Sequence, residues 1–549
     1  MYTEQLIKIL NKRGIVGEKE IEEFLSPAPK KTYPSSMLTD LDESVGFILS
    51  EIDSGSKICI YGDYDADGIT STTLMVSLLS NLLPKERLGY YIPSRFEEGY
   101  GLNKEALKTI KSRGFDLVIT VDCGSVSVDE AAFAKETGIK IIVTDHHSIS
   151  DKMVDCLLVN PKRPDSKYPF LGLSGCGVAF KLAQTIQQRS GLPKSVLTSV
   201  LDLVAIGTIG DIMPLVDENR TLCKYGLREL NKGKRYGLRR LAEETGLKMG
   251  TITSENISFV IAPHLNASGR IENASLAVKL LLAEEGDNNV DEMVASIISN
   301  NQERRRLQQQ TFEKCLKLVG EAPEDFIVLD VEDAHEGITG IVAGKIKDYF
   351  NRPTIIVTPS GDSGEFLKGT GRSVEGVNLY DNLKKNQALF ERFGGHAGAC
   401  GFLMKKENFC TLRNNLIGQI EEIRKETPDV FDKKYDIDLT MNPADISIDL
   451  SEEIQLLAPF GNENPKPLVD FRNVEVNDVQ FMGKDKTHVK FFTKNSSLER
   501  IQWVLFGRAQ EQRELFLSGT KVNVLGNLDI NVWQGRQNMQ VMIKNIEKA

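Results

Sequence analysis

The chain has 549 residues, of which 41% are hydrophobic and 26% charged, with a formal net charge of −10. At about 150 residues per domain, this length predicts three or four folding units. No apolar run approaches the ~20 residues that cross a bilayer, and the charged N-terminus lacks a signal-peptide pattern. None of the eight cysteines sits in a CxxC pair. We therefore expect a cytoplasmic globular protein with reduced cysteines and no membrane partner.

The N-terminal part of the sequence predicts a leader followed by an α/β lobe. Residues 1–40 are predicted to form a short helical leader that ends in the proline-bearing stretch SPAPKKTYPSS. Short apolar runs then alternate with helical stretches, at residues 57–61, 115–121, 139–144 and 156–160. Continuous apolar strands that alternate with helices indicate a parallel sheet with both faces covered.

The rest of the chain predicts three further parts. Residues 216–320 are mostly helical, and a second α/β unit starts at residue 326. From about Phe431, five or so alternating strands with Gly and Asn turns suggest a small barrel of the OB type. The expected fold class is α/β, with a parallel-sheet lobe and a second α/β lobe joined by a helical connector, plus a C-terminal OB-like β-barrel. The expected boundaries are 1–40, 41–220, 221–322, 323–430 and 431–549.

Acidic and imidazole side chains follow three successive predicted strands. They are Asp63, Asp65, Asp67, Asp122, Asp145, His146 and His147. Ligands bind beyond the carboxyl ends of the strands in an open parallel sheet, so these side chains should converge. A further acid, Asp211, lies in the apolar stretch VAIGTIGDIMPL, where an unpaired buried carboxylate would be costly.

So many carboxylates in one place require a counter-charge, because each close pair repels by ~4 kcal/mol at an effective dielectric of about 20. Divalent cations remove this conflict, and mixed carboxylate and imidazole ligands suit Mg²⁺ or Mn²⁺. Two ions about 3.5–4 Å apart can activate water and stabilise the leaving oxygen of a phosphodiester. Asp122, at the end of a central strand, is the candidate bridging ligand.

Each of these motifs also has a less specific interpretation. GDYDADG could open a calcium loop, but the twelfth position from Asp63 is Leu74 rather than glutamate. A single strand-end aspartate is more often a helix cap, although three successive ones favour a metal site. The basic stretches 224–240 and 304–306 fit either nucleic-acid contact or a solvated surface, and the sequence leaves both open.

Together these motifs resemble the DHH phosphoesterase superfamily, whose signature is a DxD loop, a strand-end Asp, a DHH triplet and a later Asp. AHEGITGIVAGKI, KGTGRSVEG and RFGGHAGACGF resemble its DHHA1 domain. APHLNASGR, APFGNENPKP and the β-rich tail resemble the RecJ branch, so the resemblance covers residues 45–549. One departure is Gly210, where alanine is expected and where glycine could loosen the backbone beside Asp211.

The resemblance implies roles for individual residues. Two divalent cations, Mn²⁺ or Mg²⁺, would be held by Asp65, Asp67, Asp122, His146 and Asp211. His147 would face the scissile phosphate as an electrostatic or acid group, while Asp63 and Asp145 would orient ligands and water. The substrate phosphates would be held by Arg270, Thr370, Arg372 and Ser373, with a further contact from Arg95. His396 would close on the substrate from the second lobe.

The function implied is 5′-to-3′ exonuclease action on single-stranded DNA, releasing 5′-mononucleotides in DNA repair and recombination. There are two alternative functions. The first is hydrolysis of short oligoribonucleotides, cyclic dinucleotides or pyrophosphate, and the second is a non-enzymatic scaffold of the replication-factor type. The first alternative needs only the two lobes, so the connector and the barrel argue against it. The complete ligand set argues against the second alternative. The expected partners are single-stranded DNA and, from the resemblance only, a single-strand-binding protein and a helicase. The chain itself is expected to be a monomer.

Overall fold

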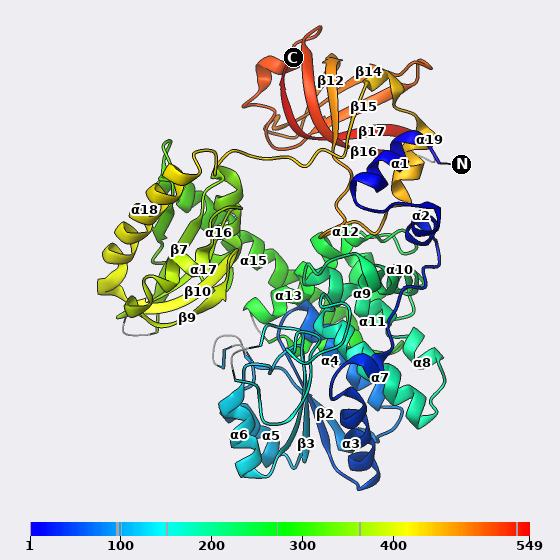
Figure 1. Ribbon diagram of the computed structural model, residues 1–549, viewed down its shortest axis with the longest axis vertical. Coiled ribbons are helices and arrows are strands. Elements are labelled where there is room, and N and C mark those ends of the chain that lie inside the picture. Colours follow the sequence, from blue (N-terminus) through cyan, green and yellow to red (C-terminus); the bar gives the residue numbers. More distant parts are fainter. Residues whose placement is uncertain are drawn as a thin grey trace. The chain divides into compact units, whose positions relative to one another are not determined.

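The computed structural model describes residues 2–94, 98–99, 101–149, 152–271, 273–361, 364–533 and 536–549. The chain forms two compact units (Figure 1). The first unit comprises residues 1–93, 100–262 and 435–549, and the second comprises residues 94–99 and 263–434. No helix among the residues so described is long and apolar enough to cross a membrane.

A five-stranded parallel sheet of order β2-β1-β3-β4-β5 is the centre of the first unit. Its strands are β1 (Ile58–Gly62), β2 (Leu88–Tyr91), β3 (Leu117–Val121), β4 (Lys140–Thr144) and β5 (Leu157–Val159). Its helices are α3 (Leu41–Asp53), α4 (Ala66–Leu79), α5 (Lys104–Ser112), α6 (Val128–Thr137) and α7 (Gly175–Ser190). Helices α5 and α6 cover one face, and α3, α4 and α7 lie on the other (Figure 1). Every residue of β1 and β3 is buried, as expected for central parallel strands.

More helices extend this unit and lead into the next. They are α8 (Ser195–Thr198), α9 (Leu201–Gly210), α10 (Asp217–Asn231), α11 (Tyr236–Glu244) and α12 (Ser254–Asn256). A π-helical turn, Ile257–Ile261, runs into α13 (Ala262–Ile271). Helices α14 (Ser275–Leu282) and α15 (Val290–Val319) follow. The stretch predicted as one connector is therefore helical but divided between the two compact units.

A seven-stranded sheet completes the first unit, in the order β11-β12-β16-β17-β15-β14-β13. The strands are β11 (Leu439–Met441), β12 (Val469–Glu475), β13 (Asn477–Met482), β14 (His488–Lys494), β15 (Arg500–Leu505), β16 (Lys521–Trp533) and β17 (Arg536–Lys548). We expected five or so strands. Short β11 adds a parallel edge strand, and β16 and β17, of thirteen residues each, pair along most of their length.

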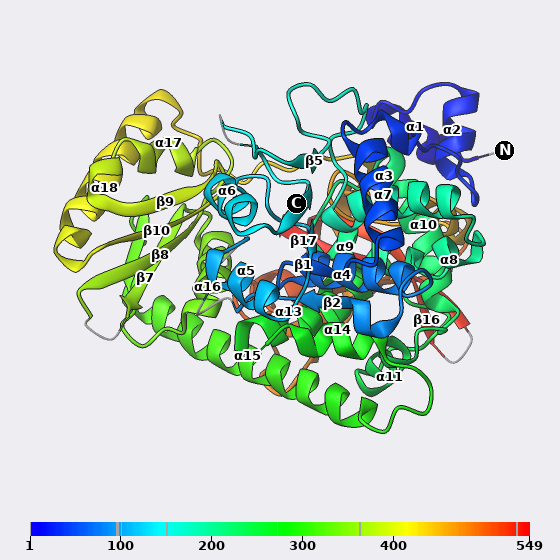
Figure 2. The same cartoon turned by 90° about the horizontal axis from the view of Figure 1, so that it is seen from below.

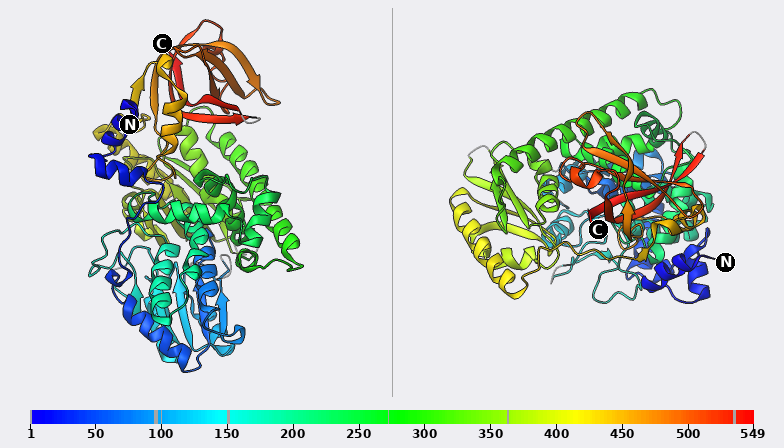
Figure 3. Two further views of the ribbon diagram at one scale, coloured as in Figure 1. Left: turned by 90° about the vertical axis from the view of Figure 1, so that its right-hand side faces the viewer. Right: turned by 90° about the horizontal axis from the view of Figure 1, so that it is seen from above.

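The leader packs into the core of this C-terminal sheet. Helix α1 (Glu4–Lys12) lies beside α19 (Ile448–Gln455), and α2 (Glu18–Leu25) adds Ile21 and Leu25 to the same cluster. In Figure 3 the blue N-terminal helices lie next to the orange and red C-terminal part. Leu6, Ile9 and Leu10 are fully buried in the same cluster as Trp503. The Arg13 guanidinium also pairs with Asp438 at 2.9 Å. The two ends of the chain therefore share one hydrophobic core.

The second unit contains a mixed five-stranded sheet of order β6-β7-β8-β10-β9. Its strands are β6 (Ile327–Asp330), β7 (Thr354–Ser360), β8 (Phe366–Arg372), β9 (Phe390–His396) and β10 (Ala399–Lys405). Helix α16 (Glu336–Phe350) packs with α15 on one face (Figure 2). Helices α17 (Leu379–Lys384) and α18 (Phe409–Glu426) cover the other. The predicted fold class is confirmed for both lobes and for the β-rich C-terminal domain.

Candidate metal centre

The acidic residues of the first lobe lie where strands and helices end. Asp63 follows β1, Asp122 follows β3 and Asp145 follows β4. Asp65 caps α4, and its carboxylate accepts the N–H groups of Asp67 and Gly68 at 3.0 and 3.1 Å. Parallel strands bring their carboxyl ends to one edge of the sheet, which explains why residues far apart in sequence meet there.

His146 and Asp122 lie at the centre of the cluster. The Nε2 atom of His146 is 3.1 Å from Asp122 Oδ1, 3.5 Å from Asp211 Oδ2 and 3.9 Å from Asp67 Oδ2. Three sets of ligand atoms each lie within 4.8 Å of one another, namely Asp122/His146/His147, Asp67/His146/Asp211 and Asp63/Asp65/Asp122. Because Asp122 and His146 each belong to two sets, the geometry suits two neighbouring cations.

Without bound cations, the buried carboxylates of this cluster repel one another. Burial, reinforced by neighbouring carboxylates, raises the pKa of Asp67 to about 7 and that of Asp211 to about 8. The same causes raise the pKa of Asp122 well above its usual value. Burial also lowers the pKa of His146 to about 3, so this imidazole is neutral and able to ligate.

Asp122 Oδ1 and His146 Nε2 are among the buried atoms of this site that make no hydrogen bond within the described parts of the chain. Unsatisfied buried polar atoms are uncommon in proteins and call for an explanation. Divalent cations would accept both lone pairs and neutralise the carboxylates. The residues present therefore fit a binuclear metal site.

His147 has a different environment from its neighbour. Its Nδ1 atom lies 2.8 Å from Asp145 Oδ1, and its side chain is 43% exposed. Burial would lower the pKa of His147, but the hydrogen bond to Asp145 and the carboxylate charge raise it to about 9. Asp145 also accepts the backbone N–H groups of His146 and Ser125, at 2.7 and 2.9 Å. The pair is thus built as an oriented imidazolium beside the metal cluster.

Several residues that position the site had not been predicted. The N–H groups of Gly175 and Cys176, in the first turn of α7, donate to Asp67 at 2.6 and 2.9 Å. Helix N-termini favour anions, so α7 holds this carboxylate in place. Asn160, directly after β5, donates to the His147 carbonyl at 2.9 Å and to Ser125 Oγ at 2.8 Å. Its place at a strand end is a signal that could have identified Asn160.

The loop after Asp211 is held by a segment from the C-terminal part of the chain. Ile212 has φ +56°, which is strained for a β-branched residue. Asn462, in the GNENP segment, donates its amide to the Ile212 carbonyl at 2.9 Å and accepts the Leu215 N–H at 2.8 Å. At Gly210, a methyl group would lie 3.1 Å from the Ala66 Cβ, so glycine permits close packing beside Asp211.

Five of the residues expected to bind substrate belong to the second unit. Arg270, Thr370 and Arg372 line one cavity of about 340 Å³. Ser373 donates its hydroxyl to the Val377 carbonyl at 2.6 Å, and exposed His396 ends β9. The sixth expected residue, Arg95, lies outside the described residues.

The two basic stretches are largely committed to contacts within the protein. Arg235 pairs with the buried Asp202 at 2.7 Å, and Lys224 donates to the Ser26 carbonyl at 2.8 Å. Arg240 and Arg306 form ion pairs with glutamates on their own helices. These four side chains are engaged by the protein itself, and the choice between nucleic-acid contact and a solvated surface stays open for the two stretches.

Comparisons with known proteins agree with this arrangement. Residues 57–208 match the DHH family, N-terminal domain, residues 324–422 the DHHA1 domain, and residues 437–545 the RecJ OB domain. The single-stranded-DNA-specific exonuclease RecJ of Bacillus subtilis is 38% identical over 99% of this chain and 68% of its own length. Its counterpart in Salmonella typhimurium is 30% identical over 98% of this chain and 95% of its own length.

A solved structure extends the similarity to three dimensions. RecJ of Thermus thermophilus in complex with Mn²⁺ matches with a TM-score of 0.81 and 28% identity, over 99% of this chain and 76% of that one. The same protein in complex with Mg²⁺ matches with a TM-score of 0.78. The parallel sheet, its DHH triplet and the DHHA1 domain define a DHH phosphoesterase. Within that class, the chain belongs to the RecJ family of single-stranded-DNA-specific exonucleases.

Proposed function

We propose that the chain is a metal-dependent exonuclease that hydrolyses single-stranded DNA in the 5′-to-3′ direction, releases 5′-mononucleotides, and acts in DNA repair and recombination. The observation that carries this proposal is that Asp122 and His146 each belong to two of three overlapping ligand sets. Membership of the RecJ family supports the substrate class. A single-strand-binding protein and a helicase are proposed partners of a monomeric, cytoplasmic enzyme.

The ligands in this proposal are Asp65, Asp67, Asp122, His146 and Asp211. When bound, two cations, Mn²⁺ or Mg²⁺, would supply a nucleophilic water and charge stabilisation at the phosphate. The N–H groups at the start of α7 orient Asp67, and Asp63 and Asp145 act as supporting carboxylates. His147, held as an imidazolium by Asp145, offers positive charge and a proton to the phosphate. In the second unit, Arg270, Thr370, Arg372, Ser373 and His396 would bind phosphates, as would Arg95.

Asp122→Asn tests the proposal, because asparagine tolerates the left-handed backbone (φ +63°) of this position. Loss of the bridging carboxylate should lower hydrolysis of a 5′-labelled single strand by about 10³-fold or more. Metal-free stability should not fall, since the substitution removes a buried anion from a repelling cluster. Asp155→Asn, at an exposed residue of the same lobe, should change neither property.

The label also tests polarity. A 5′-label should appear in mononucleotides at the start of the reaction, whereas a 3′-label should appear there only at the end. Activity of Asp122→Asn above about a tenth of wild type would refute the two-metal site. Release of internal oligonucleotides would refute exonuclease action.

A further inference from the structure

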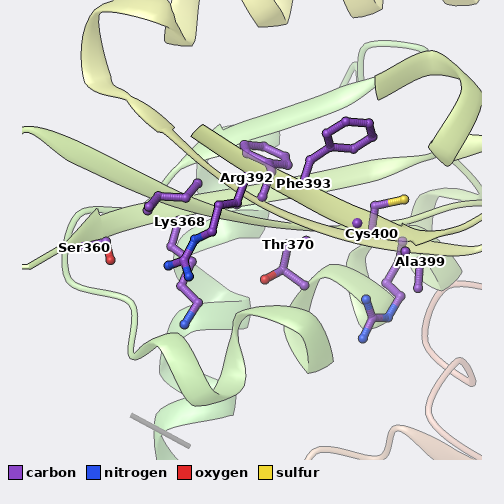
Figure 4. A pocket seen from close by; sticks show the side chains of 14 residues that line it. Ser360, Lys368, Thr370, Arg392, Phe393, Ala399 and Cys400 are labelled. Carbon is purple, nitrogen blue, oxygen red and sulfur yellow. The ribbon is translucent and has the colours of Figure 1, made fainter. Parts of the chain in front are cut away.

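The sheet face opposite α17 and α18 carries positively charged side chains that have no role in the proposed site. Lys368 on β8, Leu403 on β10 and Arg392 on β9 lie in register across three strands. Residues directly opposite one another in a sheet point to the same face. Figure 4 shows Lys368, Thr370 and Arg392 on one side of the sheet and Phe393 on the other. The three polar residues line a cavity of about 470 Å³.

The next row across the same face is nearly bare. It consists of Thr370, Gly401 and Gly394, which are paired in register. A Cβ on Gly394 would meet nothing within 4 Å, and one on Gly401 only the Gly369 carbonyl at 3.8 Å. Neither glycine has a positive φ. Neither backbone conformation nor packing within the described residues therefore requires glycine here, although glycine in a strand costs about 0.5–1 kcal/mol.

The third row restores positive charge. Arg372 pairs in register with Ala399, which pairs with His396. The first and third rows are four residues apart, or about 13 Å at the usual strand rise. This spacing lets the two rows contact phosphates that are two nucleotides apart in an extended strand, with the glycine floor beneath the part of the strand between them.

Charge in the first row comes mainly from Arg392. Lys368 pairs with Glu336 at 2.7 Å, which offsets its charge. Arg392 is exposed, and no ion pair or hydrogen bond involves its side chain in the regions that the structure describes. Its guanidinium is therefore available to a ligand, and its planar fork suits a phosphodiester.

We propose that this face is an additional nucleotide subsite for the single strand. Arg392, assisted by Lys368, binds one phosphodiester. The Gly394–Gly401 floor admits the part of the strand that follows, and the Arg372 row receives the phosphodiester two nucleotides away. This proposal rests on the proposed function, because it takes single-stranded DNA as the ligand. It adds a contact two nucleotides beyond the phosphate expected at Arg372.

Two pairs of matched variants test it, with binding of a fluorescent single-stranded 20-mer measured without divalent metal at several salt concentrations. Arg392→Ala should weaken binding about tenfold, as for loss of one charge-assisted contact, and should make the log–log salt slope shallower by about 0.7. Lys425→Ala removes an exposed charge from α18, on the other face, and should change binding less than about twofold.

The second pair fills space without removing charge. Gly401→Val should weaken binding similarly while leaving the melting temperature equal or higher, because valine suits a strand and meets no close neighbour. Gly418→Val, on α18, also enters open space and should leave DNA binding unchanged.

Wild-type affinity and salt slope in both Arg392→Ala and Gly401→Val would overturn the subsite. So would tight binding of free thymidine monophosphate that Arg392→Ala abolishes, since that would identify a pocket for a free nucleotide. Failure of the proposed function would be seen separately, as absence of nucleotide release by the wild-type protein with metal.

Discussion

Gly175 and Gly207 show how closely single residues approach the metal cluster. A Cβ on Gly175 would lie 2.4 Å from Asp122 Oδ1, and one on Gly207 would lie 2.4 Å from Asp67 Oδ1. Non-bonded contacts of a Cβ atom are essentially never so short. Either methyl group would therefore displace a proposed ligand. At these positions glycine is required by the close approach of a carboxylate.

Gly175→Ala should therefore damage metal binding while preserving the helix. We expect Mn²⁺ affinity to fall by about tenfold to a hundredfold, the range seen when residues that support metal ligands are changed. Helix α7 should remain stable, because alanine is a better helix former than glycine. Calorimetric titration with Mn²⁺ measures the effect.

Gly177→Ala is the matched control for this prediction. Its methyl group would meet the Leu173 and Ser174 side chains, the nearest at 3.3 Å, rather than a carboxylate. Equal Mn²⁺ affinities in the two variants would contradict the steric role of Gly175.

Arg372 is a second residue whose substitution should have a specific effect, here on catalytic efficiency. Its Nη1 donates to the Gly371 carbonyl at 2.8 Å, and its Nη2 lies 3.0 Å from where a Cβ on Gly340 would stand. Arg372→Ala should lower kcat/KM by about 10²-fold, as for a lost positioning contact, with metal affinity unchanged. The loss should be larger on a 5′-phosphorylated strand than on a 5′-hydroxyl strand. Equal and small losses on both would remove Arg372 from the site.

At the scale of elements, a buried ion pair joins α7 to α10. The Lys181 ammonium and the Glu218 carboxylate form a hydrogen-bonded pair, and their side chains are 1% and 0% exposed. Glu218 also accepts the Tyr168 hydroxyl and the Tyr33 N–H, the latter at 3.1 Å. Burial lowers the pKa of Lys181 although Glu218 opposes that shift. The pair fixes the helices that flank the metal cluster.

Lys181→Met should destabilise the first unit by about 3–5 kcal/mol, because it leaves a buried carboxylate without a counter-charge. Thermal unfolding followed by circular dichroism would show this as a lowered melting temperature. Lys181→Met combined with Glu218→Gln should regain more than half of the loss. Lys194→Met, at an exposed lysine, serves as control. A double variant no more stable than Lys181→Met would show that packing, rather than charge, dominates here.

At the scale of the whole molecule, the two chain ends form one folding unit. Leu6, Ile9 and Leu10 of α1 are fully buried beside strands that begin more than 400 residues later. The GNENP segment before β12 reaches the loop that follows Asp211. The leader and the C-terminal sheet are therefore parts of the unit that carries the metal cluster.

Leu10→Ala should consequently destabilise the C-terminal sheet, although the substitution lies at the opposite end of the sequence. A truncated core leucine costs about 2–5 kcal/mol through lost burial and the remaining cavity. The only two tryptophans, Trp503 and Trp533, lie on β15 and β16, so their fluorescence reports on this sheet. Val16→Ala, at a residue 60% exposed, should leave that transition unchanged. An unchanged tryptophan transition in Leu10→Ala would contradict the shared core.

The sequence by itself determined the architecture of the lobes and the convergence of their acidic residues. Both follow from local patterns, since apolar runs define strands and parallel strands bring their carboxyl ends to one edge. Asp63, Asp122 and Asp145 could be placed together because each directly follows a strand. The motifs of the second lobe and of the tail were recognisable for the same reason, as they are contiguous in the chain.

Only the tertiary structure decided which distant residues support that cluster. The α7 amides on Asp67, the Asn462 contact to Ile212 and the burial of α1 under the C-terminal sheet join segments about 100 to more than 400 residues apart. The partners of Arg235 and Lys224 likewise showed that much of a basic stretch serves packing. Periodicity and short motifs report on neighbours along the chain. Contacts between segments depend on how whole faces pack, and no local pattern specifies that packing.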